Sequence, residues 1–582
     1  MITDEPQREN MHLPIREEYD AIVVGSGVSG GWAAKELTEG GLRVLLLERG
    51  RPVTHGKDYV TEHKPDWEFP FREARLTPET PGTEEFQVQA RTGQFREDCK
   101  HWFINDKTHP YEEAQPFTWI QGNQLGGRSL IWGRQVYRWS DLDFEANMKD
   151  GHGVDWPIRY ADIAPWYSHV EKFIGVSGEK LGLAHLPDGE FQPPMEMNAG
   201  EKYVRRGLKR AFPDRHFTIG RVAILTRDLP GRAACHYCGP CPRGCSTGSY
   251  FSSLSSTLPA ANRTGRLTTQ TSSLVHSLIY DDATQRVTGV RVIDAETKQD
   301  RVVSAKIVFL CASTLNSTRI LLNSTSARFP NGLGNDSGEL GHNLMDHHFM
   351  AGANGQIPGL LDRYYQGNRP NGIYLARFRN LGDDGTKRTD FVRGYGYQGG
   401  AGRSGWGRGG SEPGIGVALK NKLRTPGGWG FGMTAFAECL PYHENKVELS
   451  ERKDEFGIPI LRVDAKWREN ELAMRKDMVA QAAEMLEAAG VRNVSTYDAH
   501  REGQLGAEIG LGIHEMGTAR MGRDPKTSVL NAWNQVHTVP NVFVTDGACM
   551  TSASCVNPSI TYMALTARAA THAVDELKRR NL

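Results

Sequence analysis

Four cysteines lie within eleven residues of this 582-residue chain, in the segment CHYCGPCPRGC. Cys235, Cys238, Cys241 and Cys245 have the spacing C-x2-C-x2-C-x3-C, which is known from iron–sulfur ligand runs, except that Ser246 follows where proline is usual. A zinc site normally pairs two Cys-x2-Cys units about a dozen or more residues apart, so this run is too compact for zinc. We therefore expect an iron–sulfur cluster, [4Fe–4S] in preference to [3Fe–4S]. A disulfide-bonded or free-thiol loop is the alternative.

A glycine motif, Gly25-x-Gly27-x-x-Gly30, follows a short apolar strand and precedes a helical pattern. Gly25 permits a tight turn, Gly27 lets the backbone approach a pyrophosphate, and Gly30 lets helix and strand pack closely. The helix N-terminus offers free N–H groups to the phosphates. A second strand, 43–47, ends at Glu48, where an acid can accept the ribose hydroxyls. The motif predicts a dinucleotide site but does not separate FAD from NAD.

The elements that position these motifs come from distant parts of the chain. Strand patterns occur at 267–280, 287–293 and 301–310, and helical patterns at 469–489 and 559–578. Strands and helices around a glycine motif are typical of an α/β fold with a Rossmann-type dinucleotide-binding domain. A β-rich region between these parts predicts a second domain that binds the substrate.

The segment QGNQLGGRSLIWGRQVYRW at 121–139 resembles the glucose–methanol–choline (GMC) flavin oxidoreductases, and most of all their branch of pyranose oxidases and glucoside 3-dehydrogenases. In that branch a Gly-Gly-x-Ser segment lies along the flavin ring, and Gly126, Gly127 and Ser129 match it. Pyranose oxidase carries a flavin-linked histidine two residues after the serine. The matching residue here is Ile131, so the resemblance implies FAD that is bound non-covalently.

The C-terminal part resembles the catalytic segments of the same family. GIHEMGTARMG carries His514, and CVNPS carries Asn557, which follows 43 residues later (557 − 514) as in the pyranose-oxidase branch. The resemblance implies that this pair is catalytic. The chemistry suits both side chains, because a neutral imidazole can take the hydroxyl proton of an alcohol while an amide orients the oxygen.

Further cofactor contacts are implied by the resemblance. Asp546 matches the acid beside the ribityl and pyrophosphate groups, and Val275 lies in the strand expected against adenine. Pro558 suits the first turn of the last helix, whose dipole would favour anionic reduced flavin. The segment 338–347 resembles the family's link between domains, and we assign His347 a structural role.

The resemblance covers nearly the whole chain and predicts three parts. An FAD-binding domain of the Rossmann type spans 18–345 and includes the cysteine-rich insertion 233–250, a β-sheet substrate domain spans 346–500, and 501–582 returns to the FAD domain. The glycine-rich run 398–416 predicts a mobile loop. We interpret this loop as a lid over the substrate or, equally, as a surface loop.

Composition excludes several classes of function. Lys and Arg together number 69, as do Asp and Glu, so no net field attracts nucleic acid or acidic lipid. No run approaches the roughly 18 apolar residues of a membrane span. The first ten residues lack the pattern of an export signal. We expect a cytoplasmic protein, or a periplasmic one if a partner subunit carries it across the membrane.

The resemblance, together with the cysteine run, implies an FAD-dependent dehydrogenase that oxidises a secondary hydroxyl of a sugar or glycoside, at C3 of a glucoside, to a 3-keto sugar. Hydride passes to flavin N5, and the cluster delivers electrons to a small subunit or cytochrome, possible partners in a hetero-oligomer. One alternative is an enzyme like pyranose 2-oxidase that uses O2. Another is an iron–sulfur electron-transfer subunit with a vestigial flavin site.

Overall fold

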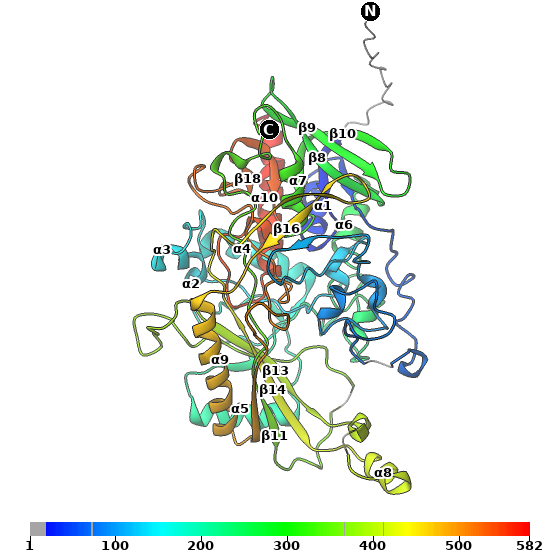
Figure 1. Ribbon diagram of the computed structural model, residues 1–582, viewed down its shortest axis with the longest axis vertical. Helices are drawn as coiled ribbons and strands as arrows, with labels where there is room; N and C mark the ends of the chain where they lie inside the picture. Colours follow the sequence, from blue (N-terminus) through cyan, green and yellow to red (C-terminus); the bar gives the residue numbers. More distant parts are fainter. Residues whose placement is uncertain (1–18, 72–73, 366, 411) are drawn as a thin grey trace, which may run out of the picture.

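The computed structural model describes residues 19–71, 74–365, 367–410 and 412–582. Two expectations lie outside these residues: that the first ten residues carry no export signal, and that the FAD-binding domain starts at residue 18. Figure 1 shows one half of the molecule built on a mostly parallel sheet with its helices and a second half built on an antiparallel sheet. The sequence-based prediction of an α/β fold with a second β-sheet layer is confirmed.

The first sheet has the order β18-β19-β10-β1-β2-β7, in which all pairs except β18–β19 are parallel. The central strands are buried on both faces because their residues are almost all apolar, as in VLLL of β2. Two antiparallel strands, β8 and β9, extend from β10. The strands are β1 (Tyr19–Val24), β2 (Val44–Leu47), β7 (Leu267–Gln270), β8 (Ser273–Asp281), β9 (Arg286–Asp294), β10 (Asp300–Leu310), β18 (Gln535–Val536) and β19 (Val539–Val544).

Helices surround this sheet. Helix α1 packs against α10 and α6, and α10 also packs against α4 (Figure 1). The predicted last helix, 559–578, is confirmed. The helices are α1 (Val28–Glu39), α4 (Tyr160–Ile174), α6 (Thr257–Arg263), α7 (Thr314–Asn323) and α10 (Ser559–Lys578).

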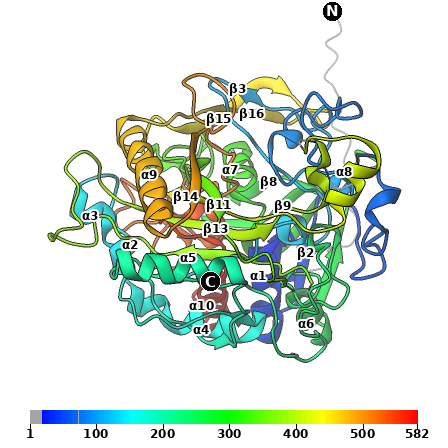
Figure 2. The same ribbon diagram turned by 90° about the horizontal axis from the view of Figure 1, so that it is seen from below.

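The second sheet is antiparallel, with the order β17-β11-β14-β13-β12-β6. Burial alternates strictly along β14, so one face of the strand packs on the core. Helices α5 and α9 pack against strands of this sheet, as Figure 2 shows from below. The elements are β6 (Phe217–Ile219), β11 (Ala351–Ile357), β12 (Ile373–Leu375), β13 (Tyr395–Arg403), β14 (Trp429–Ala437), β17 (Arg492–Asp498), α5 (Ala199–Ala211) and α9 (Glu469–Ala488).

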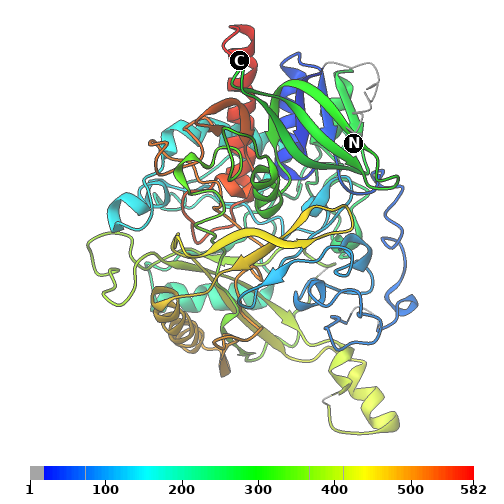
Figure 3. The same ribbon diagram turned by 45° about the horizontal axis from the view of Figure 1, so that its top comes forward.

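A small third sheet runs between the two halves, where its hairpin appears yellow in Figure 3. The rest of the chain forms short elements. These are β15 (Lys446–Lys453), β16 (Pro459–Asp464) and β3 (Glu112–Glu113) of the third sheet, then β4 (Val176–Ser177), β5 (Phe191–Gln192), α2 (Asp141–Phe144), α3 (Ala146–Asp150) and α8 (Gly416–Leu423).

The structure differs from the sequence-based expectations in three places. The expected strand 267–280 is two strands, β7 and β8, because the chain turns through Ser272 at a φ of 51°. Strand β6 and helix α5 belong to the second half, although 18–345 was expected to form the FAD domain. The run 398–416 is not simply a loop, since β13 extends to Arg403. In the described part of the chain, no helix is long and apolar enough to cross a membrane.

Candidate active site

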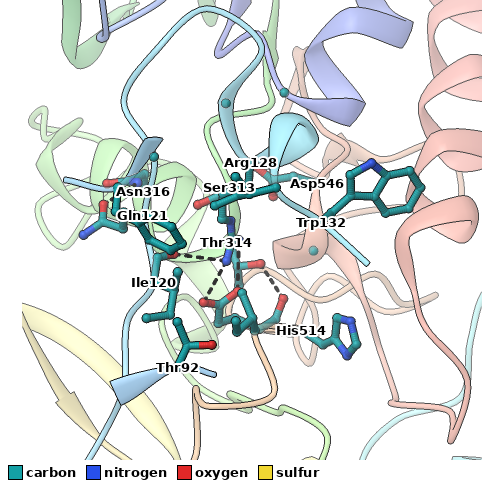
Figure 4. Close-up of a pocket in the computed structure, with 18 of the residues that line it drawn as sticks. Thr92, Ile120, Gln121, Arg128, Trp132, Ser313, Thr314, Asn316, His514 and Asp546 are labelled. Carbon is teal, nitrogen blue, oxygen red and sulfur yellow. Dashed lines mark hydrogen bonds and ion pairs between the residues drawn. The ribbon is translucent and has the colours of Figure 1, made fainter. Parts of the chain in front are cut away.

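A cavity of about 840 Å³ lies where the two halves meet, and residues from both halves line it. Figure 4 shows Asn316 and Gln121 on one side of this cavity and Trp132 and His514 on the other. A cavity of this size is large enough for a cofactor together with a substrate.

The glycine motif forms one end of the cavity. Gly25 has a φ of 92°, which favours glycine, and the chain turns there out of β1. A methyl group on Gly27 would meet no atom within 4 Å, so the backbone is open to the cavity. Helix α1 begins at Val28 without a side-chain cap, which leaves its first N–H groups available for an anion.

Glu48 lies at the same end, buried beside the glycine turn. Its carboxylate accepts hydrogen bonds from the N–H and hydroxyl of Ser26 and from the N–H of Gly50 at 2.8 Å. Burial raises the pKa of Glu48, and the bonds from Ser26 act in the opposite direction. The Ser26 hydroxyl also accepts the Gly126 N–H at 2.8 Å, which ties the Gly-Gly-x-Ser segment to the nucleotide turn.

Most predicted site residues line this cavity. They are Gly25, Gly27, Glu48, Gly127, Ser129, Val275, His514, Asp546 and Asn557. Three other predicted cofactor residues do not line it. Gly30 packs against the Gly25 carbonyl, where a methyl group would lie 1.8 Å from the oxygen, and Gly126 faces Leu254. Pro558 is the N-cap of α10, and its neighbours Asn557 and Ser559 line the cavity in its place.

His514 and Asn557 are adjacent at the other end. His514 Nε2 lies 3.3 Å from Asn557 Nδ2, and the Asn557 oxygen accepts a hydrogen bond from Gln398 Nε2 at 2.7 Å. The other ring nitrogen of His514, Nδ1, lies 2.9 Å from Nδ1 of His347. Gln398 comes from β13 and the other three residues from loops, so both halves of the molecule build this end.

The loop that carries His514 is held by a buried carboxylate. Asp346 accepts backbone N–H groups from His347, Gly510, Gly512 and His514 at 2.7 to 3.0 Å. Burial raises the pKa of Asp346 to about 7, with a further contribution from Glu515, while the N–H groups favour the carboxylate.

An ion pair lies beside the base. Arg128 forms two bonds with Glu515, at 3.0 and 3.2 Å, and Figure 4 shows it among the lining residues. Burial lowers the pKa of His514 well below its usual 6.5, and His347 and Arg128 lower it further. The His514 imidazole is therefore neutral near pH 7 and available as a base. Burial also raises the pKa of Asp546 to about 6.

Aromatic side chains line the cavity near His514. Phe349 stacks on Phe436 with ring centres 5.2 Å apart, and Phe436 also approaches the His514 ring. In the glycine-rich run, the Arg403 side chain donates a hydrogen bond to the Gly427 carbonyl and the Arg408 side chain donates one to the Gly405 carbonyl. Neither arginine lines the cavity.

The four clustered cysteines surround a separate, small cavity, together with Tyr250 and Asn368. All nine cysteines are described and unpaired, so no disulfide joins any of them. The Tyr237 N–H points at Cys235 Sγ at 3.4 Å, and the Thr247 hydroxyl lies 3.3 Å from Cys245 Sγ. Hydrogen bonds to sulfur are among the features that tune iron–sulfur sites.

The described residues contain no group of three or more His, Cys, Asp or Glu side chains placed to hold a metal ion. The described residues therefore do not support the expected iron–sulfur cluster, and the four cysteines are free thiols around the small cavity. Soft thiol ligands on one short loop are nevertheless the ligand type that iron–sulfur clusters use.

The residues at the first end fit a bound FAD. The open face of Gly27 and the uncapped start of α1 would hold the pyrophosphate of FAD, and the carboxylate of Glu48 would accept its ribose hydroxyls. Gly127 faces Gly27, and a methyl group on it would lie 3.5 Å from the Gly27 Cα. Ile131, which stands where pyranose oxidase carries its flavin-linked histidine, also lines the cavity.

Comparisons with known proteins match most of the chain. Full-length relatives include 2-methyl-1,2-propanediol dehydrogenase of Mycolicibacterium austroafricanum, 28% identical over 95% of this chain and 94% of the relative. Paromamine 6'-oxidase of Streptomyces fradiae is 26% identical over 97% and 92%. The fructose dehydrogenase large subunit of Gluconobacter japonicus is 24% identical over 96% and 98%.

The fold also matches a solved structure, pyridoxine 4-oxidase from Mesorbium loti. The TM-score is 0.60 at 18% identity, over 95% of this chain and 98% of the other. Two profiles of one family, each described as GMC oxidoreductase, match residues 19–349 and 441–566. The chain therefore belongs to the GMC oxidoreductases, the flavin-dependent family that its motifs resemble.

Proposed function

We propose that this protein is an FAD-dependent dehydrogenase that oxidises a secondary hydroxyl of a sugar or glycoside, at C3 of a glucoside. The observation that carries the proposal is the pair His514 and Asn557, 3.3 Å apart in the cavity that also contains the dinucleotide turn. An imidazole can take the hydroxyl proton of an alcohol and a neighbouring amide can hold the oxygen, so the pair suits alcohol oxidation.

The residues act on the substrate as follows. His514 takes the hydroxyl proton at Nε2, and the Asn557 amide holds the oxygen from which the proton leaves. Bound FAD supplies a hydride acceptor for the substrate carbon. Loss of the proton while the hydride leaves completes the carbonyl, and general bases of this kind contribute roughly 10²–10⁴-fold to rates.

A sugar substrate is supported by the walls of the cavity and by the relatives. Phe349, Phe436 and Trp132 offer apolar ring faces on which the C–H face of a pyranose can lie. Gln398 and Arg134 offer polar groups for its hydroxyls. Fructose, gluconate and paromamine appear in the names of similar proteins.

Electron transfer to an external acceptor is supported by the cysteine loop. Cys235, Cys238, Cys241 and Cys245 would hold an iron–sulfur cluster, which supplies single-electron transfer. The acceptor we propose is a small subunit or a cytochrome, since one relative is named as the large subunit of fructose dehydrogenase. A matched test is Cys238→Ser, which should lower bound iron while leaving bound FAD unchanged.

The role of His514 is tested by replacing it with alanine. His514→Ala should lower turnover of a glucoside by about 10²–10⁴-fold, because the general base is removed. His500→Ala is the control, since His500 does not line the cavity. Turnover of His514→Ala within about tenfold of wild type would refute the assignment.

A separate experiment locates the oxidised carbon. Borodeuteride reduces the new carbonyl and leaves deuterium on its carbon, and we expect that deuterium at C3.

A second candidate is an oxidase like pyranose 2-oxidase, because paromamine 6'-oxidase is among the full-length relatives. The two candidates differ in the fate of the electrons. Peroxide formed in equal amount to the oxidised sugar would favour the oxidase, and turnover only with an added dye or cytochrome would favour the dehydrogenase.

A further inference from the structure

His347 has a hydrogen bond at each ring nitrogen, and one of them leads to the proposed base. Its Nε2 contacts the backbone carbonyl of Ser554, and its Nδ1 lies 2.9 Å from Nδ1 of His514. The side chain is 1% exposed, and burial lowers its pKa to about 4, so the ring is neutral. A neutral imidazole carries one N–H and one bare nitrogen.

The carbonyl of Ser554 fixes where the protons lie. A carbonyl oxygen only accepts, so His347 must donate from Nε2, and its Nδ1 must be bare. A bare Nδ1 is an acceptor, so Nδ1 of His514 must carry the hydrogen of the 2.9 Å contact. Neutral His514 then has a bare Nε2, which is the nitrogen that faces Asn557.

The amide beside it agrees with this assignment. The oxygen of Asn557 accepts from Gln398, so the amide nitrogen is the atom turned toward Nε2 of His514. An N–H facing a bare nitrogen is a compatible pair, whereas two facing N–H groups would repel.

We propose that His347 is a positioning residue that keeps the catalytic His514 in the tautomer with Nε2 unprotonated. The proposal rests on the proposed function of His514 as the base. Asp346 supports it, because one carboxylate accepts the backbone N–H groups of both histidines and fixes their separation. When His514 takes the substrate proton at Nε2, its Nδ1–H still donates to Nδ1 of His347, so the ring keeps its orientation.

Loss of His347 should therefore act on the rate more than on binding. Without the acceptor, the His514 proton can move to Nε2 and block the base. His347→Phe should lower the rate of flavin reduction at saturating glucoside by about 10–100-fold, as for other partners that orient a histidine. The apparent Kd of the sugar should stay within about twofold of wild type. His347→Asn, which restores an acceptor near Nδ1, should recover much of the rate.

His348→Phe is the matched control. His348 is equally buried and also bonds a backbone carbonyl, that of Glu438, yet no contact joins it to His514 in the described structure. It should retain the wild-type rate. Equal losses in both Phe variants, measured at full FAD content, would reduce His347 to a structural role and overturn the proposal.

A second readout needs no substrate. The ¹⁵N spectrum of His-labelled holoenzyme, with His514 identified by its loss in His514→Ala, reports which ring nitrogen is protonated. We expect a protonated Nδ1 and a bare Nε2 in wild type, and a mixture or the opposite tautomer in His347→Phe. An Nε2–H tautomer in wild type would overturn the proposal. An inert sugar together with the expected tautomer would instead refute the proposed function alone.

Discussion

The reactivity of His514 is set by what surrounds its ring. Burial lowers its pKa most, and His347 and Arg128 add to this effect. Glu515 pairs with Arg128, which keeps the positive charge from standing alone beside the base. The lowered pKa favours the neutral form of the His514 imidazole, which is the form that the proposed role as a base requires.

A pH profile tests this electrostatic account. The unprotonated imidazole is the active form, so a lowered pKa moves the acidic limb of activity to lower pH. The rate of flavin reduction should remain constant from weakly alkaline pH down through 6.5 and fall only in more acidic buffer. Stopped-flow absorbance of the flavin measures it. An acidic limb centred at or above the ordinary 6.5 would contradict the account.

At this scale the sequence singled out His514 and Asn557, gave His347 only a structural role and missed Gln398, for a physical reason. His514 and Asn557 are in motifs that carry their own local pattern. Gln398 and His347 contact them from 159 and 167 residues away, and no spacing in the chain encodes such contacts. Gln398 was also not recognised because it begins a glycine-rich run that predicted a loop.

The start of helix α1 shows how a single element can combine stability with binding. Gly27 and Gly30 belong to one motif but have different surroundings. A methyl group on Gly27 would point into the open cavity, while one on Gly30 would lie 1.8 Å from the Gly25 carbonyl oxygen. The first glycine therefore leaves room for the cofactor, and the second leaves room for the strand.

Two alanine variants separate these roles. Gly27→Ala should leave the Tm of the apoprotein close to wild type and weaken FAD binding, because the methyl group enters the space for the pyrophosphate. Gly30→Ala should lower the Tm of the apoprotein by several degrees, because the added methyl group overpacks the site and lowers the free energy of unfolding by about 1–3 kcal/mol. Scanning fluorimetry with and without FAD measures both. Equal loss of apoprotein stability in the two variants would contradict the assignment.

Strand β13 explains why the glycine-rich run was misread as a loop. A methyl group on Gly399 would lie 2.1 Å from the Gly432 oxygen, and one on Gly372 would lie 2.0 Å from the Gly399 oxygen. These glycines are needed where neighbouring strands approach closely. Sequence composition alone does not distinguish this use of glycine from its use in a flexible segment.

At the scale of the molecule, only the side chains of Arg134 and Tyr250 need to be crossed between the two cavities. Arg134 lines the larger cavity, and its guanidinium carbon lies 4.9 Å from the centre of the Tyr250 ring. Tyr250 in turn lines the cavity of the four cysteines. A cluster held there would lie one layer of side chains from the flavin site, which suits transfer of electrons out of the first cavity.

The presence of a parallel sheet around the glycine motif and of a second, β-rich half could be predicted from the local patterns of the sequence. The contribution of β6 and α5 to the second half could not be predicted, because β6 has only three residues and the partners of the two elements, β12 and α9, are distant in the sequence. Tertiary packing, and not local propensity, decides where such elements lie.

The anaerobic absorption spectrum of the purified holoenzyme, before and after addition of a glucoside, tests the central claim most directly. The account predicts flavin bands over the broad visible absorption of thiolate-bound iron, with rapid bleaching of the flavin by the sugar. If neither sugars nor alcohols bleach the flavin, the claim is contradicted, and the alternative of an electron-transfer subunit is favoured. Bleaching without bound iron would instead keep the oxidation and remove the cluster.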